Sequence, residues 1–197
     1  MVAEAQRAAA VAQAGDERRG ARAHRRRWPA VLAVALLLAL AQAFLAEPFR
    51  IESGSMLPTL RGGDRVLVDK RAYRDALPRR GDLVVFHAPR SGDVTLKRAV
   101  GLPGDSVAIE DGALVVNGRR RSEPYADPDA IDSVYFGPAR VRAGTVFVLG
   151  DNRADSIDSR DYGAVSRGDL MGRVRVRLWP PARWGDPTRG LREPARR

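Results

Sequence analysis

The chain has 197 residues, of which 44% are hydrophobic, so there is room for one modest domain and two tails. The absence of cysteine excludes disulfide bridges and thiolate metal sites. The net charge of +10 gathers at the ends: residues 1–30 carry seven arginines and three acidic residues (+4), and residues 179–197 carry five and two (+3). Only +3 is left for the middle, whereas a nucleic-acid-binding domain concentrates its charge on the folded part, so we predict no nucleic-acid partner.

The N-terminal region predicts a cytoplasmic basic tail, residues 1–27, followed by one transmembrane helix, residues 28–46. Gln42 is the only strongly polar residue of the apolar run, and 19 helical residues span roughly 28 Å at about 1.5 Å per residue. Six arginines within residues 18–27 predict that the N-terminus stays in the cytoplasm. The small-x-small sequence at residues 41–43 suggests a cleaved signal peptide as the alternative, but the long charged leader favours the anchor.

The pattern then changes to one typical of β-strands and predicts a mostly-β domain over residues 47–178. Among its turn signals, Asn117-Gly118 is a strong hairpin signal. Runs of β-branched and aliphatic residues predict strands at residues 65–68, 83–86, 95–100, 106–109, 113–116, 145–149 and 172–178.

Two stretches of the chain lie outside the predicted strands. Residues 119–140 are rich in arginine, aspartate and proline and predict an exposed excursion. Residues 179–197 are rich in proline and arginine and predict a poorly packed tail, in which Trp179 and Trp184 dock on the sheet or touch lipid headgroups.

The stretch over residues 51–60 directly follows the predicted anchor and contains two serines, Ser53 and Ser55, around Gly54. Glycine permits a turn that a β-carbon would hinder, and Pro58 pushes the preceding residue towards an extended backbone. We expect a tight loop that holds a hydroxyl at a fixed angle, as a nucleophilic serine requires, together with a base that takes its proton.

The candidate bases are few. His24 lies before the apolar run and so across the predicted membrane, and His87 reads as a surface residue at a strand end. Arginine cannot lose its proton near neutral pH, but a desolvated lysine can, and the chain has only two lysines. Lys70 stands among charged residues and reads as a solvated surface charge. Lys97 stands in a predicted strand, and a lysine that faces a core there has a lowered pKa.

Three blocks in order resemble bacterial type I signal peptidase. They lie at residues 53–60, 97–105 and 150–160 behind the predicted anchor, and the resemblance covers residues 47–178. It implies a signal-peptidase-like domain of coiled β-sheets, a serine endopeptidase with a Ser55/Lys97 dyad, and no metal or organic cofactor. Signal peptides of exported preproteins, cut after small-x-small sites, and the lipid bilayer are the implied partners. The implied location is the cytoplasmic membrane, single-pass, with the catalytic domain outside.

The resemblance also assigns roles to residues around the dyad. The Ser55 N–H and the Ser53 hydroxyl would form the oxyanion hole, and Ser156 would orient the lysine. Supporting ion pairs would join Asp158 to Arg160 and Asp151 to Arg98. Apolar residues that would bury the lysine are Phe86, Val148 and Ile157. Residues that match the lining of two shallow substrate pockets are Phe49, Ile51, Leu60, Val66, Val85 and Leu96.

Glu52 departs from the family pattern, because many relatives have proline at this position. The departure adds a charge and an N–H near the bound peptide and leaves fine substrate preference open. Three other interpretations of the whole chain also stay open: a peptidase specialised for one secretion system, a self-cleaving repressor-type Ser/Lys protease, and an anchored β module without activity. The repressor-type protease would need a DNA-binding domain where this chain has an apolar run.

Overall fold

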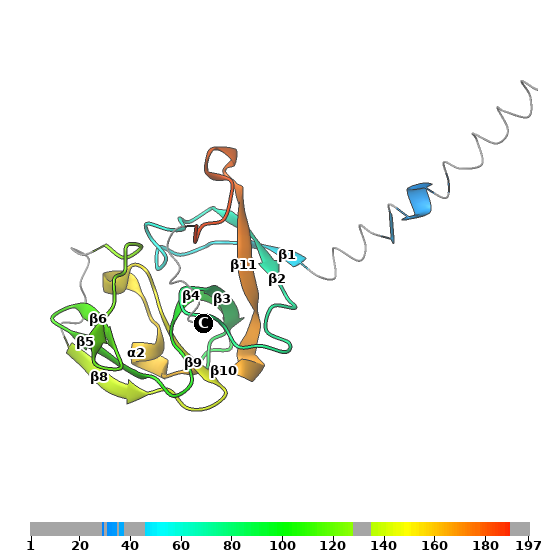
Figure 1. The fold of residues 1–197 in the computed structure, drawn as a ribbon. Helices are drawn as coiled ribbons and strands as arrows, with labels where there is room; N and C mark the ends of the chain where they lie inside the picture. Colours follow the sequence, from blue (N-terminus) through cyan, green and yellow to red (C-terminus); the bar gives the residue numbers. More distant parts are fainter. Residues whose placement is uncertain (1–28, 30, 35, 38–45, 128–134, 190–197) are drawn as a thin grey trace, which may run out of the picture. The chain divides into compact units, whose positions relative to one another are not determined.

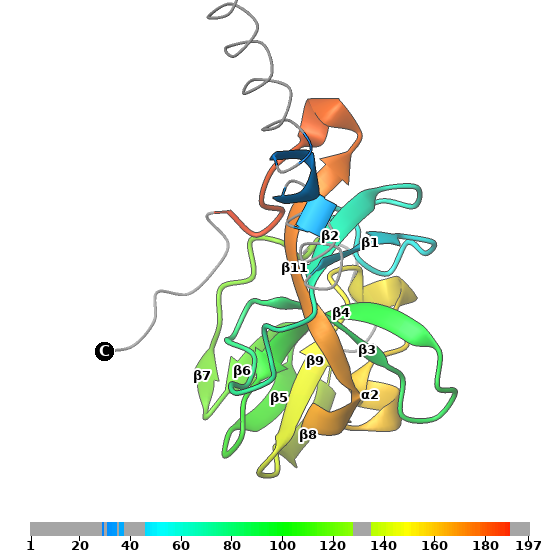
Figure 2. The same cartoon turned by 90° about the vertical axis from the view of Figure 1, so that its right-hand side faces the viewer.

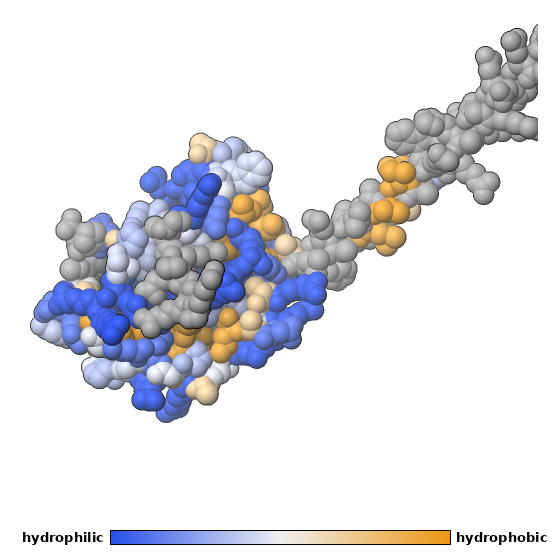
Figure 3. All heavy atoms as spheres, viewed as in Figure 1, coloured by the Kyte–Doolittle hydropathy of each residue, from blue (hydrophilic) through white to orange (hydrophobic). Residues whose placement is uncertain are grey.

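A computed structural model describes residues 29, 31–34, 36, 37, 46–127 and 135–189, and the chain divides into two units, Met1–Phe44 and Leu45–Arg197. In the first unit the described residues are helical, and apolar side chains at positions 31–34, 36 and 37 are exposed (Figure 3). The predicted basic tail and most of the predicted anchor lie outside the described residues. Within the described part of the chain, no helix is long and apolar enough to span a bilayer.

The second unit is mostly β, as predicted (Figures 1 and 2). Its larger sheet has seven strands in the order β1-β2-β11-β3-β4-β9-β10. The long strand β11 runs between β2 and β3, which are far apart from it in the sequence (Figure 2). The strand bounds are β1 Ala46–Arg50, β2 Arg65–Asp69, β3 Leu83–His87, β4 Val94–Gly101, β9 Thr145–Leu149, β10 Val165–Ser166 and β11 Leu170–Trp179.

A four-stranded sheet, in the order β7-β6-β5-β8, inserts between β4 and β9 in the chain. Its strands are β5 Ser106–Glu110, β6 Ala113–Val116, β7 Arg119–Arg120 and β8 Tyr135–Arg140. The predicted Asn117-Gly118 hairpin is confirmed: both residues have positive φ, and Val116 pairs with Arg119 across the turn. Two consecutive residues of positive φ match the right-handed twist of the flanking strands, which is why Asn-Gly is favoured there.

The run Leu83-Val84-Val85-Phe86 is apolar without alternation because β3 is buried on both faces. Leu83 and Val85 pack with one core cluster, and Val84 and Phe86 pack with another. A third cluster joins the two sheets through residues such as Leu149 and Val107. The central strands β3 and β4 therefore lie in the deepest part of the domain, and β4 carries Lys97.

Two segments that lie outside the predicted strands are more ordered than expected. Residues 135–140, inside the predicted excursion, form β8 and pair with β5; they were missed because most of their side chains are exposed and two of the residues are Gly137 and Pro138. Residues 180–189 of the predicted loose tail also pack, since η3 (Pro181–Arg183) follows β11, Arg183 forms an ion pair with Asp64, and Thr188 is buried. Residues 128–134 and 190–197 lie outside the described part.

Three further short helices complete the described fold: η1 (Arg153–Asp155), α2 (Ser159–Tyr162) and η2 (Arg167–Asp169). The first two lie in the predicted signal-peptidase-like block at residues 150–160. Asp158 caps α2 by accepting a hydrogen bond from the Arg160 N–H. Because a carboxylate at an N-cap satisfies otherwise unpaired N–H groups, this residue fixes the path of the chain beside the β4–β9 pair.

Candidate active site

The loop between β1 and β2 carries Ser55 and is closed at its base. The Ile51 N–H donates to the Asp64 carbonyl, and the Gly63 N–H donates to the Ile51 carbonyl. Within the loop, Met56 and Leu60 are fully buried and anchor it to the core beneath β3. Ser55 thus lies on a segment held at both ends and in the middle, as a nucleophile of fixed geometry requires.

Gly54 does not need the special backbone freedom that the sequence suggested. Its φ lies outside the left-handed region, and an added β-carbon would make ordinary contacts, 3.5 Å to Leu57 Cδ1 and 3.6 Å to Asp155 Oδ2. Neighbouring chain holds the loop instead, because the Asn152 N–H donates to the Ser55 carbonyl at 3.0 Å. The shape of the loop therefore depends more on the segment after β9 than on glycine.

Lys97 Nζ lies 2.6 Å from Ser55 Oγ, although the two residues are 42 positions apart. Both side chains are buried, and Lys97 is only 4% exposed. Strand β4 orients the lysine, because Lys97 pairs with Val84 of β3 and so shares its face. The arrangement places a potential proton acceptor in direct contact with a hydroxyl group.

The pKa of Lys97 is lowered from its ordinary value, chiefly because burial disfavours the charged ammonium. Three carboxylates, on Asp158, Asp151 and Asp155, act in the opposite direction and raise it, whereas Arg160 lowers it further. Burial outweighs the carboxylates, so less alkaline conditions suffice to make the amine neutral.

Two of the three residues expected to bury the lysine lie on its face of the sheet. Phe86 and Val148 are fully buried and belong to one core cluster on this face of the sheet. Ile157 does not cover the lysine: it is 76% exposed. Its neighbours explain this, since Ser156 and Asp158 are both committed to inward hydrogen bonds, and the side chain between them is left facing solvent.

Ser53 Oγ lies 3.2 Å from Ser55 Oγ on the exposed side of the loop. Among the described residues, no acceptor takes a hydrogen bond from the Ser55 N–H. The Ser53 hydroxyl and the Ser55 N–H are thus two candidate donors at this position. Glu52, the residue that departs from the family pattern, is exposed beside them.

The structure places the Ser156 hydroxyl on Asp158, to which it donates at 2.9 Å, rather than on Lys97. Asp158 is buried and also accepts from the Gly150 N–H and from Arg160 Nε, at 3.0 and 2.9 Å, so the predicted Asp158–Arg160 pair is present. Gly150 is needed for this packing. A β-carbon there would come within 2.5 Å of Ser156 Cβ and 2.7 Å of the Ser55 carbonyl oxygen.

The second predicted ion pair, Arg98–Asp151, is also present and has no exposed side-chain surface. Arg98 Nε and Nη2 donate to the two carboxylate oxygens at 2.7 and 2.6 Å. This fork geometry is the strong form of an arginine–carboxylate contact. Since Arg98 follows Lys97 in β4, the pair lies on the opposite face of the strand from the lysine.

An apolar pocket of about 140 Å³ lies over the face of the large sheet that carries the first core cluster. Phe49 and Val85, two of the residues predicted to line a substrate pocket, line this one, whereas Ile51, Leu60, Val66 and Leu96 are buried in the core of that face. Residues that line the pocket but were not predicted are Glu47, Val68, Lys70, Val94 and Met171. Strand alternation from Val66 could have found Val68, but Met171 depends on a bulge in β11 that leaves no sequence signal.

The two alternative bases lie away from the serine. His87 is exposed at the end of β3, with Nδ1 3.1 Å from the Gly92 carbonyl. Lys70 forms an exposed ion pair with Glu47. In the described part of the chain, no group of His, Asp and Glu side chains is arranged to hold a metal ion.

The family model for signal peptidases, peptidase S26, matches residues 25–179. The chain belongs to this family. It is 41% identical over 165 residues to a signal peptidase I of Leptolyngbya laminosa, with 79% of each chain covered. A signal peptidase I of Bacillus caldolyticus is 39% identical over 167 residues, which cover 79% of this chain and 91% of that one. A crystal structure of a signal peptidase I from Enterococcus faecalis V583 is similar at 32% identity and a TM-score of 0.41, covering 50% of this chain and 97% of that one.

Proposed function

We propose that this chain removes signal peptides from exported preproteins as a membrane-anchored serine endopeptidase, with Ser55 as nucleophile and Lys97 as general base. Membership of the signal peptidase family supports the activity. The observation that carries the mechanism is the 2.6 Å contact between Lys97 Nζ and Ser55 Oγ within a buried environment.

The first half of the reaction forms an acyl-enzyme. Ser55 Oγ attacks the scissile carbonyl carbon while neutral Lys97 takes the hydroxyl proton. The carbonyl oxygen gains the electron pair, and the resulting oxyanion is stabilised by the Ser55 N–H and the Ser53 hydroxyl. The carbon–nitrogen bond then breaks, and the Lys97 ammonium gives its proton to the leaving amine, which is the N-terminus of the mature protein.

The second half releases the signal peptide. A water molecule attacks the ester carbon, Lys97 accepts its proton, and the same donors stabilise the second oxyanion. Collapse of this intermediate breaks the bond to Ser55 Oγ, which takes the proton back from Lys97. Every proton transfer passes through one amine, which is why that amine must be able to change charge near the working pH.

The supporting residues act through the position of the dyad. Asp158 joins Ser156, Gly150 and Arg160 in one buried cluster directly behind the Ser55 loop. Ser156 donates to Asp158, and we propose that its hydroxyl turns to the Lys97 ammonium when that group forms. Arg98 and Asp151 support β4 from its other face.

Substrate choice would follow from the apolar pocket on the face of the large sheet that carries the first core cluster. The pocket lined by Phe49, Val85 and Val94 has room for a small apolar side chain. An extended peptide can add alongside the strands near the Ser55 loop and present alternate side chains to this face, as expected for recognition of a small-x-small sequence. Residues 28–46 would anchor the enzyme and place the β domain outside the cytoplasm.

Cleavage of a panel of preproteins by the full-length, detergent-solubilised enzyme tests the function. Wild-type enzyme should cut several unrelated preproteins after small-x-small sites, and Ser55→Ala should cut none. Activity on one preprotein alone would indicate a specialised peptidase, and activity in Ser55→Ala would overturn the mechanism. A reporter fused after Arg197 should be found outside the cytoplasm; a cytoplasmic reporter would overturn the topology.

A further inference from the structure

Arg98 contacts three parts of the chain that meet at the proposed active site. Besides its pair with Asp151, its Nη1 donates to the Gly81 carbonyl at 2.9 Å and its Nη2 lies 3.4 Å from Thr59 Oγ1. Thr59 belongs to the turn that carries Ser55, and Arg98 follows Lys97 directly. One fully buried guanidinium thus links the strand of the base, the loop of the nucleophile and the start of the segment at Asp151.

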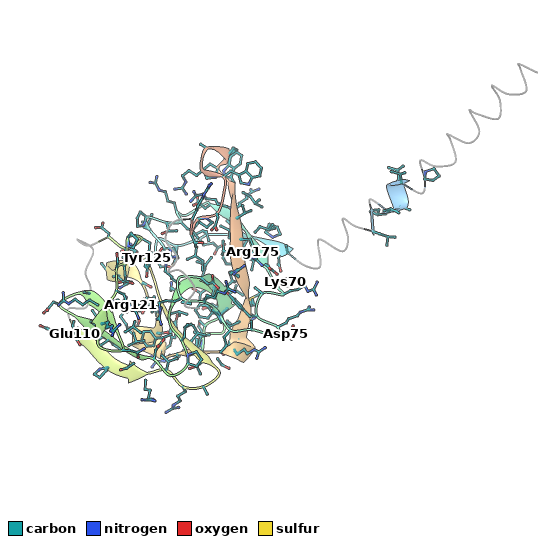
Figure 4. The ribbon with its side chains drawn as sticks, in the orientation of Figure 1. Lys70, Asp75, Glu110, Arg121, Tyr125 and Arg175 are labelled. Carbon is teal, nitrogen blue, oxygen red and sulfur yellow. The ribbon has the colours of Figure 1, made fainter. Side chains whose placement is uncertain are left out.

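Tyr125 covers the remaining face of this guanidinium. Its ring centroid lies 3.9 Å from Arg98 Cζ, a cation–π contact, and the tyrosine is buried although it comes from the stretch between β7 and β8. Figure 4 shows Tyr125 and Arg121, from this stretch, on the side of the four-stranded sheet, with Lys70 and Arg175 on the opposite side near β1 and β2. A residue of the inserted region therefore completes the surroundings of Arg98.

A chain of polar contacts holds Tyr125 in this place. Its hydroxyl donates to Glu123 Oε1 at 2.8 Å, and Arg153 forms an ion pair with the same oxygen. Arg153 Nε in turn donates to the Gly150 carbonyl at 2.8 Å, next to Asp151. The contacts run from Arg98 through the inserted stretch and return to the residue beside the partner of Arg98.

We propose that Tyr125 and Glu123, together with Arg153, form a clasp that positions the catalytic dyad by holding Arg98 against Asp151 and Thr59. This inference rests on the proposed roles of Ser55 and Lys97. The three clasp residues touch neither substrate nor reacting atoms, so they are positioning residues. The inserted four-stranded sheet then contributes to catalysis through the residues that leave it.

The dyad is sensitive to the clasp because Asp151 acts electrostatically on Lys97. The charged groups that act on Lys97 are Asp158, Asp151, Asp155 and Arg160, and Asp151 raises its pKa. The positive charge of the Arg98 guanidinium, held tightly on Asp151, offsets the negative charge of that carboxylate. Loosening Arg98 leaves the negative charge of Asp151 less offset, and this change raises the lysine pKa.

A second tyrosine–carboxylate–arginine group lies in the inserted sheet, away from the contacts that lead to the dyad. Tyr135 donates to Asp111 at 2.6 Å, and Arg120 forms an ion pair with Asp111 at 2.7 Å, so residue types and connectivity resemble those of the clasp. All three are exposed on the four-stranded sheet. Tyr135→Met is therefore a control for the loss of a tyrosine–carboxylate contact in the same inserted region.

The test compares Tyr125→Met, Tyr125→Phe and Tyr135→Met in the full-length enzyme, using an internally quenched peptide with an Ala-x-Ala cleavage sequence. Tyr125→Met should lower kcat by about 2- to 30-fold, the range expected for cation–π contacts from exposed to desolvated sites, with little change in KM. The midpoint of its kcat/KM against pH should move to higher pH. Tyr125→Phe keeps the ring and should retain most of the activity, and Tyr135→Met should match wild type.

If the clasp were purely structural, Tyr125→Met would lower only the amount of folded enzyme. The midpoint of kcat/KM against pH does not depend on that amount and would be the same as in wild type. An unshifted midpoint overturns the proposal. If Tyr125→Met does not fold, Glu123→Gln decides, since kcat should fall by a few fold and an unchanged kcat overturns the proposal. Ser55→Ala is measured beside them. Residual activity in Ser55→Ala would refute the proposed mechanism, whereas an inactive Ser55→Ala with an unaltered Tyr125→Met would refute the clasp alone.

Discussion

The two lysines of the chain occupy opposite environments. Lys97 lies in the middle of the large sheet, 4% exposed, with its amine on Ser55 Oγ. Lys70 follows β2 at the surface, with a side chain that is 45% exposed and an amine 3.0 Å from Glu47 Oε2. The same amine is a potential proton acceptor in Lys97 and a member of a solvated ion pair in Lys70. Burial and neighbours, rather than residue type, make the difference.

Replacing Lys97 by arginine should have the largest effect. Arginine keeps the positive charge but cannot give up its proton, so Lys97→Arg should be as inactive as Lys97→Ala, with kcat lower by roughly 10²- to 10⁴-fold or more. Steady-state cleavage of the quenched peptide measures this, and circular dichroism confirms that the variants fold. An active Lys97→Arg enzyme would remove Lys97 as the base.

Removing the Ser53 hydroxyl tests whether the Ser55–Lys97 pair needs a side-chain donor to the oxyanion. Ser53→Ala should lower kcat by roughly 10- to 1000-fold with little change in KM, because the hydroxyl would act on the oxyanion of the transition state and not on the bound substrate. Kinetics at saturating and at low peptide concentration separate the two constants. A wild-type kcat in Ser53→Ala would leave Ser53 as a loop residue only.

The pH dependence of the free energy of unfolding should also distinguish the buried lysine from an exposed one. This effect is smaller than the losses of kcat described above. A lysine with a lowered folded-state pKa binds a proton less readily than in the unfolded chain, so stability rises with pH between the folded pKa and the unfolded value near 10.5. Each unit of depression corresponds to about 1.4 kcal/mol. Chemical denaturation at several pH values should show that Lys97→Met exceeds wild type in stability at neutral pH and that the gap narrows as pH rises. A gap that is independent of pH would contradict a lowered lysine pKa.

Much of the fold could be predicted because its signals are local. Continuous or alternating apolar runs mark strands such as β3, and Asn117-Gly118 marks a hairpin whose backbone angles only those residue types adopt readily. By contrast, β8 was missed because its exposed side chains carry no apolar pattern. Its pairing with β5 holds it in the sheet, and its own sequence carries no signal of that pairing.

In the proposed active site, too, some contacts could be predicted from the sequence and others could not. Proximity of Ser55 to Lys97 was expected from the resemblance of short blocks, and the ion pairs of Arg98 and Asp158 lie within those blocks. The contact of Tyr125 with Arg98 could not be predicted, since it depends on how an aperiodic stretch returns to the sheet. Ile157 was expected to be buried from the resemblance, yet the inward hydrogen bonds of the residues on either side decide its direction.

The smallest expected effect comes from the same substitution at the other lysine. Lys70→Arg keeps the charge and the ion pair with Glu47, and an exposed pair of this kind contributes about 1 kcal/mol or less. Because Lys70 lines the rim of the apolar pocket and contacts neither Ser55 nor Lys97, kcat should stay within about twofold of wild type, and any change should appear in KM. The peptide assay that shows Lys97→Arg to be inactive serves for this variant too. A loss of kcat in Lys70→Arg comparable to that in Lys97→Arg would mean that the chemistry does not depend on a neutral amine at one buried position, and the contrast between the two lysines would lose its basis.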